Sequence, residues 1–342
     1  MMRCVDRCSS SWTMGWKGLT LARALPGVGA IRVASPLPWH RRSALGVAVV
    51  CTLAGCGPDG ISSNNNNESM RRCGEGWVLI PEGPFTMGID EDDPHFEPYN
   101  IPWASVPKRI VTMSDYCIGR TEVSVAEYRK CVDEGACDLP DATWNDTIEC
   151  NYSIEPGDRE RHPVNCLGWD RARAYCQWLG GDLPSEAQWE KAARGTDERF
   201  YPWGEAVPDC TRANYDKNGT YIADTGEGAG YGCSPPGPPF TWAVGHLSSS
   251  KGNSPYGLKD MAGNVMEYFL DCGDVGFWEQ CADGHCVDPV NLHDGECVQM
   301  TRGGSLLHAS TRQMNSVARG SPGDDNAPWS GIRCSKVAAL VP

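Results

Sequence analysis

Cysteine content is the feature that most constrains how this chain can fold. Fourteen cysteines lie from Cys73 to Cys334, an even number, once the four cysteines of the first 56 residues are set aside. No two of the fourteen form a CxxC pair, and Cys281-x4-Cys286 is a poor spacing for zinc ligands. The pattern therefore predicts a disulfide framework rather than a zinc site.

Proximity along the chain suggests which cysteines pair. Close neighbours are expected to form three bonds, which are Cys131 with Cys137, Cys150 with Cys166, and Cys210 with Cys233. Cys73 and Cys117 are expected to join the first two strands, and the four cysteines of an insertion at 271–300 to form two bonds among themselves. One sequence does not determine connectivity. Each closed loop would typically add about 2–4 kcal/mol of stability.

The start of the chain has the build of an export signal. A basic stretch, HRR at 40–42, precedes an apolar run from Ala44 to Ala54 that is too short to span a bilayer. Leu53-Ala54-Gly55-Cys56 looks like a bacterial lipobox, in which Cys56 becomes the lipidated first residue. The alternatives are an ordinary secretory signal or a chance apolar run.

This interpretation divides the chain into three parts. Residues 1–55 are the predicted signal. Its first 39 residues are unusually long for the basic region of a signal, and a translation start assigned too far upstream would explain them. Residues 56–72 are the lipidated cysteine and a polar, flexible tether, and residues 73–342 form one domain. We expect the domain to be exported and lipid-anchored at a bacterial cell envelope.

Composition and charge narrow the class of protein. The 39 Gly and 25 Pro favour short elements and long loops, while 13 Trp make the chain too aromatic to be disordered. The first 55 residues carry seven Lys or Arg and one Asp, so the chain from Cys56 onward has a net charge of about −20. Such a surface argues against nucleic acid or an anionic membrane surface as a direct partner. An acidic surface suits calcium binding; alternatively, the acidity simply keeps a secreted protein soluble.

Periodicity and capping predict three helices and several strands. Ser124 and Glu127 form a capping box before a helix that ends at Gly135, and Ser185 and Gln188 form another before a helix that ends at Gly195. A third helix fits the segment 169–179. Strand-like runs lie at 77–88 and near Glu122, and short strands with long loops are expected beyond Tyr201. One α+β domain is the simplest account.

The order of several motifs resembles the formylglycine-generating enzyme (sulfatase-modifying factor) family. These motifs are FTMG, RTEVSVAEY, HPVNCLGWDRARAYCQWLGGDLPSEAQWEKAARG, YPWGE, NSPYGLKDMAGNVMEY, RGGS and GIRC. The resemblance covers about residues 77–337. It implies a single loop-rich α+β domain whose core is similar to C-type lectins. It also implies oxidation of a sulfatase cysteine to formylglycine by molecular oxygen and copper held by two cysteines.

Departures from the family pattern fall where the copper would bind. The two positions that match the family's copper-binding cysteines are His308 and Gln313. Because two thiolates suit a cuprous ion and a glutamine amide does not, copper is not expected here. His308 is interpreted as an ordinary loop histidine or, alternatively, as a metal ligand. Arg302 and Ser305 of the RGGS turn match the family and would either place a substrate or shape the turn.

The resemblance also concerns two disulfides. One family bridge, from the second helix to the C-terminal motif, is kept as Cys176 and Cys334, so we expect these two cysteines to pair. Another bridge of a family enzyme matches Ala193 and Ala318, where both ends are lost. The framework is thus retained, while cysteines around the reactive groove are missing.

The GLKDMAGNVMEY segment resembles a calcium-binding loop of the family. By that resemblance Asp260 and Glu267 would supply side-chain oxygens, and Gly263 and Val265 backbone carbonyls. Asn214 matches one ligand of a second calcium site. The alternative is a glycine-rich turn that holds no metal.

Three functions remain open from the sequence. The leading hypothesis is a surface binding or scaffolding module, monomeric, with an unknown protein, peptide or glycan ligand. The second is an oxidoreductase of the wider family that uses a metal site without thiols, formed around His308. Sulfatase activation is the third.

Overall fold

The computed structural model describes residues 68, 72–96, 107–143, 145–217, 233, 240–247, 249–281, 286–292, 297–308, 311–321 and 327–339. Contacts divide the chain into Met1–Gly55 and Cys56–Pro342, and every described residue belongs to the second unit. The predicted signal at 1–55 and the predicted lipidation site Cys56 lie outside the described residues. In the described part, no helix is both long and apolar enough to cross a bilayer.

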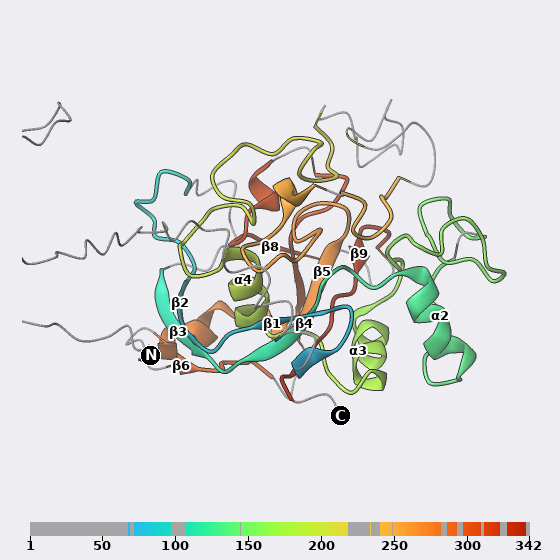
Figure 1. Cartoon of the computed structure of the whole chain (residues 1–342), viewed down its shortest axis with the longest axis horizontal. Helices are drawn as coiled ribbons and strands as arrows, with labels where there is room; N and C mark the ends of the chain where they lie inside the picture. Colours follow the sequence, from blue (N-terminus) through green and yellow to red (C-terminus); the bar gives the residue numbers. More distant parts are fainter. Residues whose placement is uncertain are drawn as a thin grey trace, which may run out of the picture. The chain divides into compact units, whose positions relative to one another are not determined.

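Short strands form three small sheets in the described part of the chain (Figure 1). The first has β4 (Tyr116–Gly119) between β1 (Trp77–Ile80) and β10 (Ser335–Val337), all antiparallel. The second has β3 (Arg109–Met113) between β2 (Gly83–Met87) and β6 (Cys286–Val287). The third has the order β8 (Arg319–Gly320), β7 (Gln299–Arg302), β5 (Met266–Cys272) and β9 (Ser330–Gly331). Residues distant in sequence thus become sheet neighbours.

The three helices expected from the sequence are present. They are α2 (Val125–Asp133), α3 (Trp169–Trp178) and α4 (Glu186–Arg194), and short 3-10 turns lie at η2 (Ser250–Gly252), η3 (Val275–Cys281) and η4 (Thr311–Met314). Both capping boxes are confirmed, because Ser124 and Ser185 each accept from the backbone N–H three residues on. Such caps satisfy backbone donors that a helix cannot pair internally.

Helix α4 lies in the middle of the domain and contacts β2, β3 and β5 (Figure 1). Ala187, Trp189 and Ala192 on this helix pack in one core cluster with side chains of the first two sheets. The helix is also buried on its polar side, where Glu190 and Arg194 are almost inaccessible to solvent. Buried charges must be paired, so the position of α4 requires a charged network inside the protein.

Seven disulfides join the fourteen cysteines. They are Cys73–Cys117, Cys131–Cys137, Cys150–Cys166, Cys176–Cys334, Cys210–Cys233, Cys272–Cys297 and Cys281–Cys286. The pairs agree with those expected from spacing and, for Cys176–Cys334, from the resemblance. The fold is therefore the predicted loop-rich, disulfide-stapled α+β type. So many disulfides indicate an oxidising, extracytoplasmic compartment.

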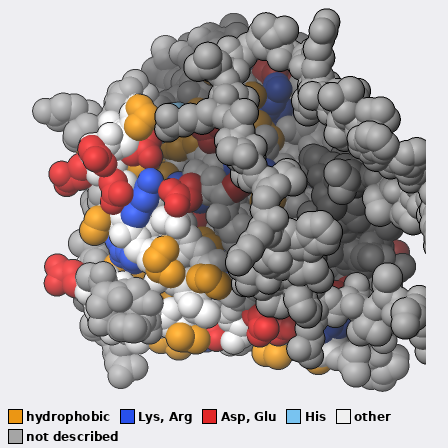
Figure 2. Space-filling view, turned by 60° about the vertical axis from the view of Figure 1, so that its left-hand side comes forward, with side chains coloured by type: hydrophobic (Ala, Val, Ile, Leu, Met, Phe, Trp, Pro, Cys, Tyr) orange, Lys and Arg blue, Asp and Glu red, His pale blue; other side chains and the backbone are white. Residues whose placement is uncertain are grey.

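The face that carries β2, β3 and β6 is mixed in character. Figure 2 shows acidic and apolar side chains interspersed on this face rather than gathered into one apolar patch. The exposed apolar side chains include Ile110 on β3 and Val287 on β6, which are 46% and 64% exposed. Scattered exposed apolar residues are normal for a soluble surface.

Candidate functional site

The RGGS turn follows β7 and is held in place by close backbone contacts. Gly303 and Gly304 have φ values of 90° and 66°, which favour glycine. A Cβ on Gly303 would lie 3.2 Å from the Trp189 ring, and one on Gly304 would lie 2.9 Å from the Gln313 carbonyl oxygen. Both glycines are needed for this turn to pack against α4 and η4.

His308 folds back onto the turn. Its Nδ1 accepts a hydrogen bond from the Ser305 backbone N–H at 2.8 Å and lies 3.1 Å from Ser305 Oγ. Burial lowers the pKa of His308 to about 4, so the ring is neutral at physiological pH. Because Nδ1 uses its lone pair to accept the N–H, the neutral ring carries its proton on Nε2. Neither ring nitrogen then offers a lone pair to a metal.

Gln313 does not complete a metal site with His308. It lies on η4 with its side chain exposed, while its carbonyl packs against Gly304. All fourteen cysteines from Cys73 to Cys334 are in disulfides. The part of the chain described here therefore brings no thiol to the RGGS turn.

The crevice beside the turn is small. Its walls are Glu149, Phe240, Thr241, Leu306, Leu307, Pro328 and Trp329, and its volume is about 10 Å³. A volume of this size holds about one water molecule. This crevice is therefore too small to hold a peptide substrate.

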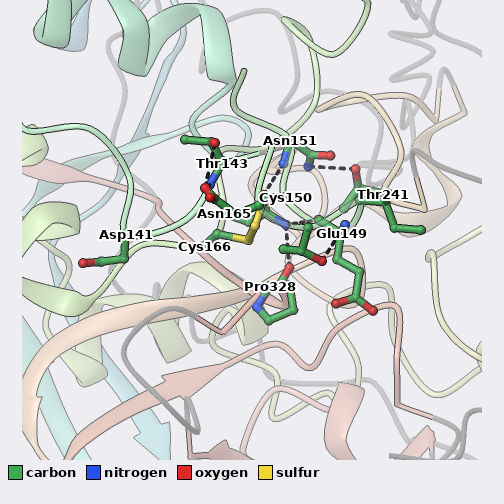
Figure 3. The surroundings of a disulfide bond; sticks show 12 residues. Asp141, Thr143, Glu149, Cys150, Asn151, Asn165, Cys166, Thr241 and Pro328 are labelled. Carbon is green, nitrogen blue, oxygen red and sulfur yellow. Dashed lines mark hydrogen bonds between the residues drawn. A yellow bond between two sulfur atoms is a disulfide. The ribbon is translucent and has the colours of Figure 1, made fainter. Parts of the chain in front are cut away.

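The disulfide nearest this crevice in the sequence is buried and surrounded by amides. Figure 3 shows Cys150–Cys166 with Asn151 and Asn165 beside it, and both cysteines are fully buried. The Asn165 amide donates to the carbonyl oxygens of Glu149 (2.9 Å) and Pro328 (2.5 Å), which joins two walls of the crevice. The Cys150–Cys166 disulfide therefore lies behind the crevice wall, and neither of its cysteines is exposed to solvent.

Arg302 is buried beside α4 and pairs there with two glutamates. Its guanidinium is buried, with Nη2 2.5 Å from Glu186 Oε1 and 3.0 Å from Glu190 Oε2. Nη1 donates to the Ser316 carbonyl at 2.8 Å, and Arg319 also pairs with Glu186. Arg302 therefore neutralises the charged side of α4 in the core.

The ionised state of Glu186 depends on these two arginines. Burial by itself raises the pKa of Glu186, but the positive charges of Arg319 and Arg302 outweigh burial and lower the pKa to about 2. The carboxylate is therefore charged throughout the physiological range. Its stabilising pairing is present above pH 4.5 and is lost as pH falls toward 2.

Glu267, a predicted calcium ligand, is paired with an arginine instead. Its Oε1 accepts from Arg333 Nη2 at 2.6 Å, and its Oε2 accepts from Arg333 Nε at 2.8 Å and from Trp189 Nε1 at 2.6 Å. All three residues are buried. A calcium ion needs six to eight oxygen ligands, and the guanidinium already supplies the positive charge here. This arrangement does not fit Glu267 as a calcium ligand.

The other predicted calcium ligands serve the backbone of the loop. Asp260 accepts from the Gly245 N–H at 2.5 Å, and the Asn214 carbonyl accepts from the Asn264 N–H at 2.8 Å. A Cβ on Gly263 would collide with the Asn214 carbonyl. Val265 is the last of the predicted ligands, and its backbone N–H donates to Glu122 at 3.2 Å. The described residues contain no group of three His, Cys, Asp or Glu able to hold a metal.

The comparison with family models decides which family this fold represents. Residues 63–338 match the model described as FGE-sulfatase, the sulfatase-modifying factor enzyme 1-like domain. The chain belongs to this family. The resemblance seen in the sequence is thereby confirmed over most of the chain.

Sulfatase-modifying factor relatives are named both as enzymes and as an inactive protein. The formylglycine-generating enzyme of Thermomonospora curvata is 29% identical over 307 residues, which cover 78% of this chain and 95% of that protein. The inactive C-alpha-formylglycine-generating enzyme 2 of Bos taurus is 30% identical over 305 residues, covering 78% of this chain and 89% of that protein. The hercynine oxygenase of Mycolicibacterium smegmatis is 31% identical over 218 residues, covering 56% and 44%.

A solved structure supports the fold alone. PvdO from Pseudomonas aeruginosa aligns with a TM-score of 0.56 at 23% identity, over 76% of this chain and 94% of that chain. The sulfatase-modifying factor fold is therefore retained in this chain despite low identity.

The sequence did not indicate the charged network around α4. Glu186, Glu190, Arg319 and Asp271 meet there, and burial raises the pKa of Asp271 to about 7, although it accepts from the backbone N–H groups of Glu186 and Asn291. The only available signal was the run of charged residues in a helix that must pack on both sides. That run fits a solvated helix face equally well.

Proposed function

We propose that this chain is a non-catalytic member of the sulfatase-modifying factor family that acts as a binding or scaffolding module. The observation that carries the proposal is the contact between the Ser305 N–H and His308 Nδ1 at 2.8 Å. This contact uses the lone pair that a metal would need at a position where the family has a thiol. The exposed side chain of Gln313 supplies no replacement.

The proposal extends to the place where the module works. The disulfides indicate an oxidising compartment, and we propose that Cys56 carries the lipid that anchors the domain at a bacterial envelope. The polar segment that follows Cys56 would then act as a tether. The ligand would be a protein, peptide or glycan, and the module would act as a monomer.

Metal retention and sulfatase conversion test the absence of catalysis. After purification and dialysis, the protein is expected to retain neither copper nor iron in stoichiometric amount by elemental analysis. Co-expression with a sulfatase is expected to leave the sulfur of its active-site cysteine in place by mass spectrometry. The control is the same experiment with an active formylglycine-generating enzyme.

Two results would contradict the proposal. The first is a formylglycine signal above background. The second is stoichiometric metal that His308→Ala removes while the disulfides and the melting temperature are unchanged.

An oxidoreductase with a non-thiol metal site is the second candidate. It is supported by the 31% identity to a hercynine oxygenase, although the chain spans less than half of that protein's length. His308 would have to release the Ser305 N–H and shift its proton to Nδ1 before Nε2 could bind a metal. The metal measurement above distinguishes this candidate from the first.

Calcium binding remains a prediction from the resemblance, and the Glu267–Arg333 pair leads us to expect a negative result. Adding EDTA should leave the melting temperature unchanged within about 1 °C, because Arg333 already neutralises Glu267. The measurement is thermal unfolding with calcium and with EDTA at matched ionic strength. A fall of several degrees with EDTA, reversed by calcium, would show that the site binds calcium.

A further inference from the structure

A larger concave site lies beside strand β10. Its volume is about 460 Å³, which is within the usual range for ligand pockets. It is bounded by β10, by the turn between β3 and β4, and by the segments that follow α3 and β6. Its apolar wall is formed by Met113, Tyr116, Leu183, Leu270, Val290 and Val337. We call this site the β10 pocket.

Val337 shows that the pocket leaves part of a core-facing sheet surface uncovered. β10 is antiparallel to β4, with Val337 opposite Tyr116 and Ser335 opposite Ile118. These four side chains therefore point to the same face of the sheet. Three of them are buried, whereas Val337 is 82% exposed. Val337 thus lies on the core side of the sheet, at the place where the pocket keeps that side open.

The outer edge of β10 offers backbone groups to a further strand. The Gly119 N–H donates to the Cys334 carbonyl at 2.9 Å. Because bonding alternates along an antiparallel pair, the N–H and C=O groups of Ser335 and Val337 point away from β4. Ser335 uses both groups in bonds to Asp182, at 2.9 and 3.0 Å. Val337 lies two residues farther along this edge, where none of the described strands continues the pairing.

The charges around the β10 pocket balance one another. The charged side chains that line it are Asp115, Asp182, Asp288 and Lys336. Arg72 pairs with Asp115 at 2.5 Å, and Arg173 pairs with Asp182 at 3.0 Å. The remaining pair, Asp288 and Lys336, has no net charge. The pocket therefore favours an uncharged occupant, because a charged group would lose hydration without meeting a net opposite charge.

We propose that the β10 pocket binds an extended peptide, which adds a strand at Val337 and inserts one apolar side chain into the pocket. The peptide residue opposite Val337 accepts from the Val337 N–H and donates to the Val337 carbonyl, as in other cases of strand addition. Its side chain then points to the same face as Val337, toward the apolar wall. A small apolar molecule would fill the pocket but would leave the strand edge unused. This inference rests on the proposed binding function and narrows its ligand to a peptide.

The walls of the pocket are held in place, which favours a preformed site. A Cβ on Gly181 would collide with the Ser335 carbonyl oxygen, so the segment after α3 packs directly on β10. Gln188 on α4 joins two other walls, because its Oε1 accepts from Ser335 Oγ at 3.1 Å and its carbonyl accepts from the Tyr116 hydroxyl at 2.5 Å. The pocket shares no lining residue with the crevice at the RGGS turn.

Fluorescence anisotropy with labelled five-residue peptides tests the proposal. The peptides are capped threonine pentamers whose central residue is leucine, phenylalanine, aspartate or lysine. We expect saturable 1:1 binding of the leucine or the phenylalanine peptide, and binding at least about 10-fold weaker for the two charged peptides. N-methylation of the central residue keeps its side chain but removes the donor to the Val337 carbonyl, and it should weaken binding about 10-fold.

Two variants of the protein test the two parts of the site. Val290→Glu places a charge in the apolar wall, and Val337→Pro removes the outward N–H. Proline is tolerated at such an edge position because this N–H does not pair with β4. Each variant is expected to bind the apolar peptide about 10-fold more weakly. The matched control is Val298→Glu, because Val298 is 67% exposed and does not line the pocket; it should bind within about 2-fold of the parent protein.

Melting temperatures establish that all variants are folded. The proposal would be overturned by an equal loss in the control, by equal binding of the N-methylated peptide, or by no saturable binding of either apolar peptide to folded protein. Dimerisation that Val337→Pro abolishes, without peptide binding, would overturn it in favour of a second copy of the chain. Any of these results leaves the metal and sulfatase measurements unaffected, so failure here is distinguishable from failure of the non-catalytic proposal.

Discussion

Replacing Arg302 with methionine should lower the free energy of unfolding by about 3–5 kcal/mol. Arg302 is fully buried and lies within 3.0 Å of carboxylate oxygens of both Glu186 and Glu190. Methionine keeps an unbranched stem but leaves these two carboxylates with less positive charge around them. Uncompensated buried charge is much more costly than the loss of one surface ion pair. Urea denaturation monitored by tryptophan fluorescence measures the change.

The matched control for this variant is Arg199→Met. Arg199 pairs with Asp197 at 2.6 Å, but the two side chains are 22% and 58% exposed, so the expected loss is below about 1 kcal/mol. Adding Glu190→Gln to Arg302→Met should recover part of the lost stability, because it removes one of the two carboxylate charges that Arg302 had helped to neutralise. Similar losses in Arg302→Met and the control would show that Arg302 is not a core charge.

Removing the disulfide Cys176–Cys334 should cost about 4–5 kcal/mol, about twice as much as removing Cys131–Cys137. The two bonds span 158 and 6 residues, respectively. The longer loop restricts the unfolded chain more, so its loss releases more conformational entropy. Double Cys→Ala variants of each pair, compared by denaturant unfolding under oxidising conditions, measure the difference.

The comparison of these two bonds is well matched. All four cysteines are buried and pack in the same core cluster, so alanine removes similar packing in both variants. A larger loss for Cys131–Cys137 than for Cys176–Cys334 would mean that packing around α2, and not loop closure, decides the stability of this fold.

Local sequence signals predicted the helices well because each depends on a few neighbouring residues. Ser124 with Glu127 and Ser185 with Gln188 complete their capping boxes within four positions. Short-range disulfides such as Cys131–Cys137 were predictable for the same reason. The long-range pair Cys176–Cys334 was expected only from the resemblance to a family.

The surroundings of the candidate site residues could not be predicted in the same way, because their partners are distant in the sequence. Glu267 has the residue type of a calcium ligand, but Arg333 lies 66 positions away and occupies its carboxylate. Arg302 matched a groove residue of the family, but Glu186 lies 116 positions away and holds it in the core. A charged side chain looks the same in a sequence whether it meets a ligand or an opposite charge.

The sequence by itself determined the family, the helix boundaries set by caps, and the absence of cysteine at 308 and 313. Only the tertiary structure decided that His308 turns its Nδ1 to the Ser305 N–H, and that Arg302 pairs with Glu186 in the core. The physical reason is the distance along the sequence between the residues that interact. Caps and turns form between adjacent residues, whereas burial and charge pairing exist only after distant segments have packed together.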